Sequence, residues 1–231
     1  MSTEQNRIFP AGQADKENRC LGIFAQGQRI YTAGSAGSAW RVSSGSLRLD
    51  RPDHESETSF ANLAIKGDVI GAEILLFGCY TFTATALADC TLSPWPEGCA
   101  VQAGDSLLHT LAKNERRAAD VIALRCGQAA DRVRRLVMLL AQQRDETVAC
   151  GLVNSATPST EWQVTLPARQ DMAEITALTL ETVSRMVSQL RRAGILNPVI
   201  RNGFASNRFF SVTSFPVQAQ RLLSANSSRV A

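Results

Sequence analysis

The sequence predicts an α+β chain that is rich in strands in its N-terminal half and helical in its C-terminal half. Short runs of alternating polar and apolar residues, broken by glycines, fill residues 22–95. From residue 105 the period changes, and apolar residues recur at three-and-four spacing. A chain of 231 residues is long enough for two domains of about 100 residues each. We therefore expect an N-terminal arm, a β-barrel, a long helix and a second, mainly helical domain, over residues 1–21, 22–103, 104–127 and 128–231.

The glycine-rich half is expected to form the antiparallel strands of a jelly roll or sandwich. The expected strands are residues 28–32, 39–43, 46–50, 58–63 and 80–86. Turn signals separate them at Gly27, Gly34, Gly37, Gly45 and Lys66-Gly67-Asp68. Together these runs predict a small β-barrel.

A long amphipathic helix is expected to follow the barrel. Its apolar positions are Leu107, Leu108, Leu111, Ala118, Val121 and Ile122. Leucines beside charged residues fit two arrangements, a helix packed on its own barrel and a helix that also pairs with its twin across a two-fold axis. After Gly127 a second amphipathic helix is expected over residues 129–142, and residues 154–160 are expected to form a connecting loop.

Residues 165–196 predict two helices joined by a tight turn. Pro167 is expected at the first helical position, Thr179 as the cap of the second helix, and Gly194 at its end. The inward-facing positions are expected to be Met172, Ala173, Ile175, Val183, Met186, Val187 and Leu190. Asn202-Gly203 predicts a hairpin, or wing, beyond the second helix.

The outward side of the second helix carries polar residues that match DNA bases. They are Glu181, Thr182, Ser184, Arg185 and Gln189. Arginine can bond both acceptors of guanine, and glutamate can accept from the cytosine amino group. Residues 165–210 contain six arginines and three acidic residues. Their excess of three positive charges equals the net charge of +3 of the whole chain. The pattern predicts a winged helix-turn-helix that binds double-stranded DNA, with Arg201 and Arg208 of the wing near phosphates.

Two segments resemble a known signature. Arg169-Gln-Asp-Met-Ala-Glu and Leu178-Thr-Leu-Glu-Thr-Val-Ser-Arg are similar to the helix-turn-helix of the cyclic-AMP-receptor/fumarate-nitrate-reductase-regulator (Crp/Fnr) superfamily of bacterial transcription regulators. Ala177 stands at the turn position where that family usually has glycine. In the barrel, Ser44-Gly45-Ser46-Leu47-Arg48-Leu49 and Gly67-Asp68-Val69-Ile70-Gly71 are similar to the family's turns, so the resemblance spans residues 22–223.

The resemblance implies a homodimeric regulator whose barrel senses a signal that shifts the long helices and so the two DNA-reading helices. The segment Glu181-Thr-Val-Ser-Arg after Leu180 resembles the subgroup that reads TTGAT-type inverted half-sites, with Glu181, Ser184 and Arg185 as base readers. RNA polymerase is an implied partner, and activation and repression both stay open. The additional DNA contacts are expected from Arg169, Gln170, Thr179, Thr182, Gln189, Arg201 and Arg208.

The effector is not identified by the sequence. Cyclic-nucleotide-binding relatives hold the phosphate with an Arg-Ser pair, and residues 71–83 contain no arginine, so cyclic AMP is disfavoured. An iron–sulfur cluster is disfavoured because, of the six cysteines, only Cys20 precedes the barrel. A small metabolite remains, in a pocket for which the candidate lining residues are Trp40, Arg48, Glu73, Tyr80, Thr81, Thr83 and Thr85.

Other responses and other functions stay as alternatives. Haem would need His54 or His109 as a ligand, and thiol chemistry would use Cys79, Cys90, Cys99 or Cys126. No CxxC pair is present, Cys150 stands apart as well, and no metal site is expected. One rival is a ligand-binding module whose helix-turn-helix makes protein contacts. Another is a cupin-like enzyme, which two isolated histidines do not support.

The bulk composition excludes membrane and export classes. No apolar run approaches the roughly 20 residues that span a bilayer. The N-terminus is polar and lacks the basic and apolar regions of a signal peptide. We expect a cytoplasmic protein that is not an enzyme.

Overall fold

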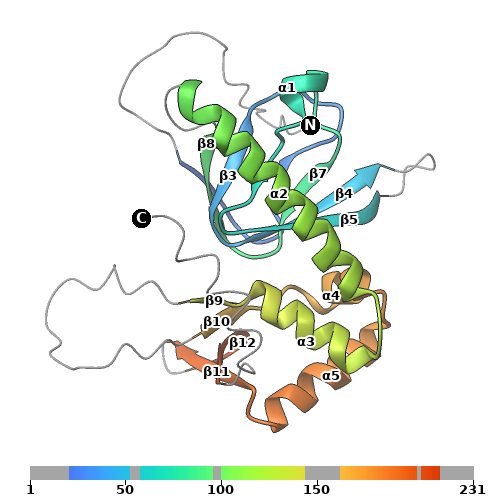
Figure 1. The fold of residues 1–231 in the computed structure, drawn as a ribbon. Helices are drawn as coiled ribbons and strands as arrows, with labels where there is room; N and C mark the ends of the chain where they lie inside the picture. Colours follow the sequence, from blue (N-terminus) through green and yellow to red (C-terminus); the bar gives the residue numbers. More distant parts are fainter. Residues whose placement is uncertain (1–20, 53–57, 96–99, 144–161, 202–203, 214–231) are drawn as a thin grey trace, which may run out of the picture.

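The computed structural model describes residues 21–52, 58–95, 100–143, 162–201 and 204–213. Its strand-rich half begins the chain and its helical half follows, as the change of period predicts (Figure 1). The N-terminal elements are β1 (Gly22–Phe24), β2 (Arg29–Tyr31), β3 (Ala39–Ser44), β4 (Ser46–Pro52), β5 (Thr58–Ile65), β6 (Val69–Ile70), α1 (Ile74–Phe77), β7 (Thr83–Ala86) and β8 (Cys90–Trp95). Each expected strand coincides with one of these, although β7 begins at Thr83 rather than Tyr80.

Two four-stranded antiparallel sheets form the barrel, in the orders β1-β8-β3-β6 and β2-β7-β4-β5. The alternation of side chains along the strands sends one set inward. Leu47 pairs with Ala64 on β5 and with Ala86 on β7, and all three are buried. Val42 and Leu92 approach them from the facing sheet in the same cluster. The expected β jelly roll of the cyclic-nucleotide-binding type is confirmed.

The long helix α2 (Ala100–Leu124) begins four residues before the expected boundary at 104 and lies along the barrel (Figure 1). Arg117 Nε donates to Asp68 Oδ2 at 3.0 Å, which ties the middle of the helix to the turn between β5 and β6. Val121, one of the six apolar positions named for this helix, is buried in the chain's own core, so it follows the arrangement in which the helix packs on its own barrel. Its position one residue before Ile122 turns it by about 100° toward the barrel. Leu107's side chain lies outside what the structure describes.

The C-terminal half packs helices on a small sheet of order β11-β12-β10-β9. Its elements are α3 (Ala129–Leu140), β9 (Gln142–Gln143), β10 (Trp162–Thr165), α4 (Arg169–Thr176), α5 (Leu180–Arg192), β11 (Leu196–Arg201) and β12 (Phe204–Val212). β11 and β12 pair antiparallel up to Arg201 opposite Phe204, so the expected wing hairpin is present. The turn residues 202–203 and the expected loop 154–160 lie outside the described residues.

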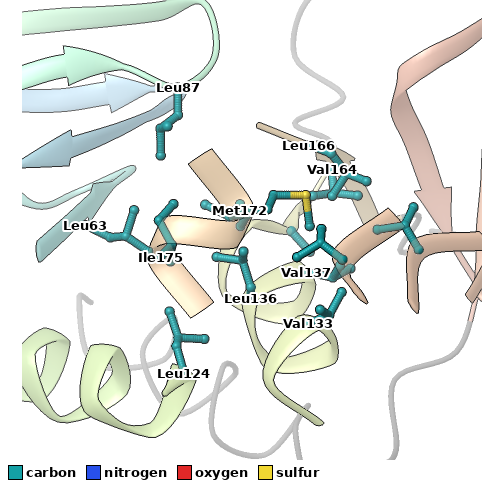
Figure 2. Close-up of a cluster of buried hydrophobic side chains, with 14 of the residues drawn as sticks. Leu63, Leu87, Leu124, Val133, Leu136, Val137, Val164, Leu166, Met172 and Ile175 are labelled. Atoms are coloured by element: carbon teal, nitrogen blue, oxygen red, sulfur yellow. The ribbon is translucent and has the colours of Figure 1, made fainter. Parts of the chain in front are cut away.

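One apolar cluster continues from the barrel into the helical half. It joins Leu63 and Leu87 of the barrel to Leu124 of α2, and through Ile175 of α4 to the remaining helices (Figure 2). Figure 2 shows Leu63 and Ile175 facing each other across the boundary between the halves. The barrel's own interior is a separate cluster around Leu47. The two halves therefore share buried apolar surface, and this surface holds the helix-turn-helix against the barrel.

The described residues were also searched for membrane-spanning helices and for metal sites. None of the described helices combines the length and the apolar character needed to cross a membrane. In the same part of the chain, no group of three or more His, Cys, Asp or Glu side chains is arranged to hold a metal ion. His109 is exposed on α2, and His54 lies outside the described residues.

Candidate nucleic-acid interface

The turn between α4 and α5 is made by Ala177 in a left-handed conformation, with φ of 51° and ψ of 49°. Its backbone N–H donates to the carbonyls of Ala173 and Glu174 at the end of α4. Leu178 N–H also donates to Ala173 O, at 3.0 Å. The turn that the sequence predicts is thus closed by backbone bonds, and alanine occupies a position that favours glycine.

We expect Ala177→Gly to stabilise the protein by about 1 kcal/mol, because an L-residue in the left-handed region costs ~1–2 kcal/mol and glycine does not bear this cost. The flexibility of glycine in the unfolded chain offsets part of the gain. Urea unfolding curves of both proteins check this value. Ala193→Gly, at the right-handed cap of α5, is the matched control and should destabilise. A loss of stability in Ala177→Gly would contradict the described turn.

α5 begins at the capping residue that the sequence predicts. Thr179 Oγ1 accepts from the backbone N–H of Thr182 at 3.2 Å, which satisfies one unpaired donor of the first turn. Gly194 has φ of +69° just after the helix, so the expected helix end is also confirmed. Pro167 is not the first helical residue: α4 begins at Arg169 with Ala168 as its cap. Pro167 instead lies in the extended segment between β10 and α4.

The expected inward and outward faces of the two helices are both observed. Met172, Ile175, Val183 and Val187 are buried between α4, α5 and α3. On the opposite side of α5, the three side chains Glu181, Arg185 and Gln189 are exposed, while Thr182 and Ser184 are half-buried. α5 lies on the side of the molecule away from the barrel (Figure 1). The exposed side chains of α5 are therefore available to a binding partner.

Glu181 and Arg185 form an ion pair across one helical turn. Arg185 Nη2 lies 2.7 Å from Glu181 Oε1, and the side chains are 59% and 83% exposed for Arg185 and Glu181. An exposed pair of this kind contributes little to stability, so its partners can be exchanged at low cost. Both groups can then turn toward base edges, the guanidinium to guanine and the carboxylate to a cytosine amino group.

A cationic cluster forms where the start of α4, the end of α5 and β12 meet. Arg169 at the start of α4 has its pKa lowered, first by burial and then by the positive charges of Arg191 and Arg208. Arg191, at the end of α5, stacks over the Phe210 ring with 5.8 Å from Cζ to the ring centroid. Three mutually repelling guanidinium groups favour a polyanion. Arg191 was not among the predicted DNA contacts. Its position near Arg169 and Arg208 depends on the packing of α5 against β12, which the sequence does not show. Arg201's side chain lies outside the described residues.

Most of the predicted pocket residues, together with Tyr31, gather around Tyr80 in the barrel. Tyr80 hydroxyl donates to Ser38 O at 2.7 Å and its ring stacks on Tyr31 with the centroids 3.8 Å apart. Burial chiefly raises the pKa of both phenols. Trp40 donates a hydrogen bond to the Tyr80 hydroxyl. The backbone N–H and the hydroxyl of Thr81 each lie 3.3 Å from Glu73 Oε1. The Ala33 N–H donates to Thr83 Oγ1 at 3.1 Å.

Thr85, half-buried on β7, pairs with Arg48 on β4. Tyr31 was missed because its short strand gives no signal for the stacking.

Arg48 has a different environment from the one expected. Its guanidinium does not join the group around Tyr80 but bonds Asp50 on its own strand and Asp171 and Glu174 on α4. Burial lowers its pKa, the bonds to these carboxylates raise it, and the net direction is upward. Arg48 therefore remains charged and is already engaged by three acids. A ligand in the barrel would not find this cation available.

The three described cysteines are free and differ in exposure. Cys90 is buried, and burial with the nearby charge of Asp89 raises its pKa to about 11. Its thiol is therefore protonated at neutral pH and a poor nucleophile. Cys79 is half-buried and Cys126 is exposed. Of these three cysteines, only Cys90 is buried in a core.

Comparison with known proteins accounts for both halves. Residues 168–196 match the bacterial regulatory proteins of the crp family, and residues 22–99 match the cyclic nucleotide-binding domain. The nitrogen fixation regulation protein FixK of Bradyrhizobium diazoefficiens is 28% identical over 192 residues, which cover 79% of this chain and 76% of the relative. The FixK protein of Rhizobium meliloti is 24% identical over 198 residues, with 84% and 85% covered.

Solved structures share the fold over most of their length. FixK2 from Bradyrhizobium japonicum has a TM-score of 0.59 at 24% identity and covers 90% of this chain and 96% of its own. A CRP-family transcriptional regulator from Thermus thermophilus has a TM-score of 0.60 at 21% identity, with 87% and 95% covered. The curated relatives are regulators rather than enzymes. With a crp-type helix-turn-helix behind a cyclic-nucleotide-binding-type barrel, the chain is similar in both halves to the transcription regulators of the Crp/Fnr family.

Proposed function

We propose that this regulator is a homodimer that reads a pseudo-palindromic operator of two inverted TTGAT-type half-sites. The observation that carries the proposal is the exposed Glu181–Arg185 pair at the start of α5, whose first turn is capped by Thr179. Ser184, half-buried between them, completes the predicted set of base readers. Arg169, Arg191 and Arg208 lie to the side, where they would contact phosphates and set the register of the helix on the duplex.

Fluorescence anisotropy of the reduced protein tests the proposal at one fixed salt concentration. One labelled duplex carries two inverted TTGAT-type half-sites and the other carries the same bases scrambled. Fixed salt is needed because phosphate contacts alone give strongly salt-dependent binding. We expect tighter binding to the operator by at least about tenfold, within the range of specificity ratios of such proteins. Equal binding to both duplexes would contradict the assigned half-site.

The dimer is proposed to form through α2. Leu108, Leu111 and Ile122 are exposed on the side of the helix away from the barrel, and Ala118 is exposed beside them. Their spacing of three, seven and four residues follows the seven-residue repeat of a two-helix seam. Large apolar side chains aligned in this way on a chain similar to the Crp/Fnr regulators favour a second copy of α2 as the partner.

We expect Leu111→Glu with Ile122→Glu to convert the dimer to a monomer, since charges in the seam would be desolvated without partners. Analytical ultracentrifugation measures the mass, and operator affinity should fall because each monomer reaches one half-site. His109→Glu, exposed on the same helix but off this stripe, is the matched control and should leave the dimer intact. A monomeric wild-type protein would overturn this part of the proposal.

The barrel is proposed to sense a small metabolite near Tyr80 and to pass the signal to α2 by shifting a population of dimer arrangements. The chemistry around Tyr80, with hydroxyls, Glu73 and stacked phenols, supports a neutral polar ligand. Arg48 is engaged by acids, and this supports the expectation that disfavours cyclic AMP. RNA polymerase is the proposed second partner at the promoter.

A further inference from the structure

Arg48 connects the barrel to the helix-turn-helix through a network of ion pairs. Its side chain is only 11% exposed. Its Nη1 lies 2.8 Å from Asp171 Oδ1, and its Nη2 lies 2.8 Å from Glu174 Oε2. Asp171 and Glu174 lie one turn apart on α4, so both face β4 together. In the sequence, Asp171 lies 123 positions and Glu174 lies 126 positions after Arg48.

The barrel alone already satisfies part of this guanidinium. Arg48 Nε and Nη2 both donate to Asp50 Oδ1, at 3.0 and 2.8 Å, and Asp50 is itself buried on β4. One buried carboxylate balances the charge of Arg48 within the barrel. The donors on Nη1 and the second donor on Nη2 are the ones that reach α4. The contact with α4 is therefore an addition to a pair that the barrel could hold by itself.

Other arginines fix the far end of α4. Arg125 at the end of α2 donates from Nε to Ile175 O at 3.3 Å and from Nη2 to Glu174 O at 3.2 Å. Arg132 of α3 donates from Nη1 to Thr176 O at 3.3 Å. Cations at the C-terminal carbonyls of a helix also suit its dipole. α4 is thus held by the barrel through the side chains of Asp171 and Glu174, and by Arg125 and Arg132 through the carbonyls of its last turn.

α4 and α5 share a buried core, so the orientation of one sets that of the other. Met172 and Ile175 of α4 pack in the same cluster as Val183 and Val187 of α5. In the arrangement held by Arg48, the reading side chains of α5 remain exposed on the side away from the barrel (Figure 1). The arrangement with these ion pairs is consequently one that can meet DNA.

We propose that Arg48, a residue of the sensor barrel, is a positioning residue for DNA recognition, and that it holds α4 through Asp171 and Glu174 at the angle that operator reading requires. This inference rests on the proposed operator-binding function. It assigns to the barrel a direct contact with the DNA-binding domain, in addition to α2. A change in the barrel that moves β4 would then reach α5 through three side chains.

The decisive variant is Asp171→Ala with Glu174→Ala, which leaves the Arg48–Asp50 pair in place. Removal of two negative charges from a DNA-binding domain strengthens its attraction to phosphates, so electrostatics alone predicts tighter binding to every duplex. If Arg48 positions α4, the loss of its two partners predicts weaker binding to the operator instead. We expect operator affinity to fall by about tenfold while affinity for the scrambled duplex stays equal or rises, a coupling of ordinary size for residues in one ion-pair network.

Three further arms complete the experiment. Arg48→Met should lower operator affinity similarly in the wild-type chain and should have little further effect in the Asp171→Ala, Glu174→Ala background. Arg48→Lys, which keeps a charge, should recover part of the loss. Asp131→Ala removes an exposed acid of α3 and is the control for charge alone. If Arg48→Met fails to fold because Asp50 loses its partner, the double alanine variant still decides.

The outcomes separate the two proposals. Unchanged or tighter operator binding by the double alanine variant would overturn the role of Arg48. Failure of the wild-type protein to distinguish operator from scrambled duplex would instead overturn the proposed half-site. In that case hydrogen exchange of the α4 amides decides whether Arg48 orders α4: faster exchange in the double variant is expected, and unchanged exchange would reject the positioning role.

Discussion

Replacing Arg185 with alanine is expected to remove most of the discrimination between operator and scrambled duplex and to leave non-specific binding nearly unchanged. The guanidinium is 59% exposed and has Glu181 as its partner before DNA is bound. A bidentate arginine–guanine contact supplies ~1–3 kcal/mol of discrimination, which corresponds to about 5- to 150-fold in affinity at each half-site. Anisotropy titrations of both duplexes at several salt concentrations measure the effect.

Arg134→Ala is the matched control, because Arg134 is an exposed arginine of the same domain on α3 rather than α5. It should change the two affinities by a similar small factor. A phosphate contact has a different signature from a base contact: its loss weakens all duplexes equally and lowers the salt dependence. If Arg185→Ala behaves in that way, Arg185 is a backbone contact and the assignment of base readout is wrong.

Leu124→Ala is expected to lower the free energy of unfolding by ~2–5 kcal/mol, the usual cost of truncating a buried leucine. Leu124 is only 1% exposed and lies in the cluster that joins the barrel to the helical half. Urea unfolding followed by tryptophan fluorescence measures it, since Trp40 and Trp95 report on the barrel and Trp162 on the C-terminal sheet. The shared cluster leads us to expect that both halves unfold in one transition.

The same truncation at an exposed site is the control. Leu76 on α1 is 83% exposed, and Leu76→Ala should change stability by no more than about 0.5 kcal/mol. Two separate transitions, with the barrel unaffected by Leu124→Ala, would show that the cluster does not couple the halves. The stabilities of Leu124→Ala and Leu76→Ala together therefore test whether the apolar contact in Figure 2 is a cooperative core.

Local patterns in the sequence were sufficient for the elements that carry the reading face. The cap at Thr179, the end at Gly194 and the inward position of Val183 each depend on residues within one or two turns of the helix. The strands of the barrel likewise follow from alternation and glycine turns. Such features are set by backbone sterics and side-chain periodicity, which are properties of short segments. The start of α4 was misplaced to Pro167 because proline fits both the first helical position and an extended segment.

The contacts between these segments could be known only from the packed fold. Arg48 was expected to line a pocket, and it instead bonds acids of α4 more than a hundred residues away in the sequence. Val121 and Ile122 are neighbours in the chain, yet the first is buried in the core and the second is exposed. Arg191 joins Arg169 and Arg208 through the packing of α5 on the sheet.

Local periodicity in the amino-acid sequence is enough to specify a strand-rich half, a long helix and a helix-turn-helix with its reading face. These features depend on residues that are close together along the chain. The contact between the halves, through Arg48 and through the cluster around Leu63 and Ile175, is set by three-dimensional packing. The physical reason is that a charged or apolar side chain finds its partner only when distant segments are brought together.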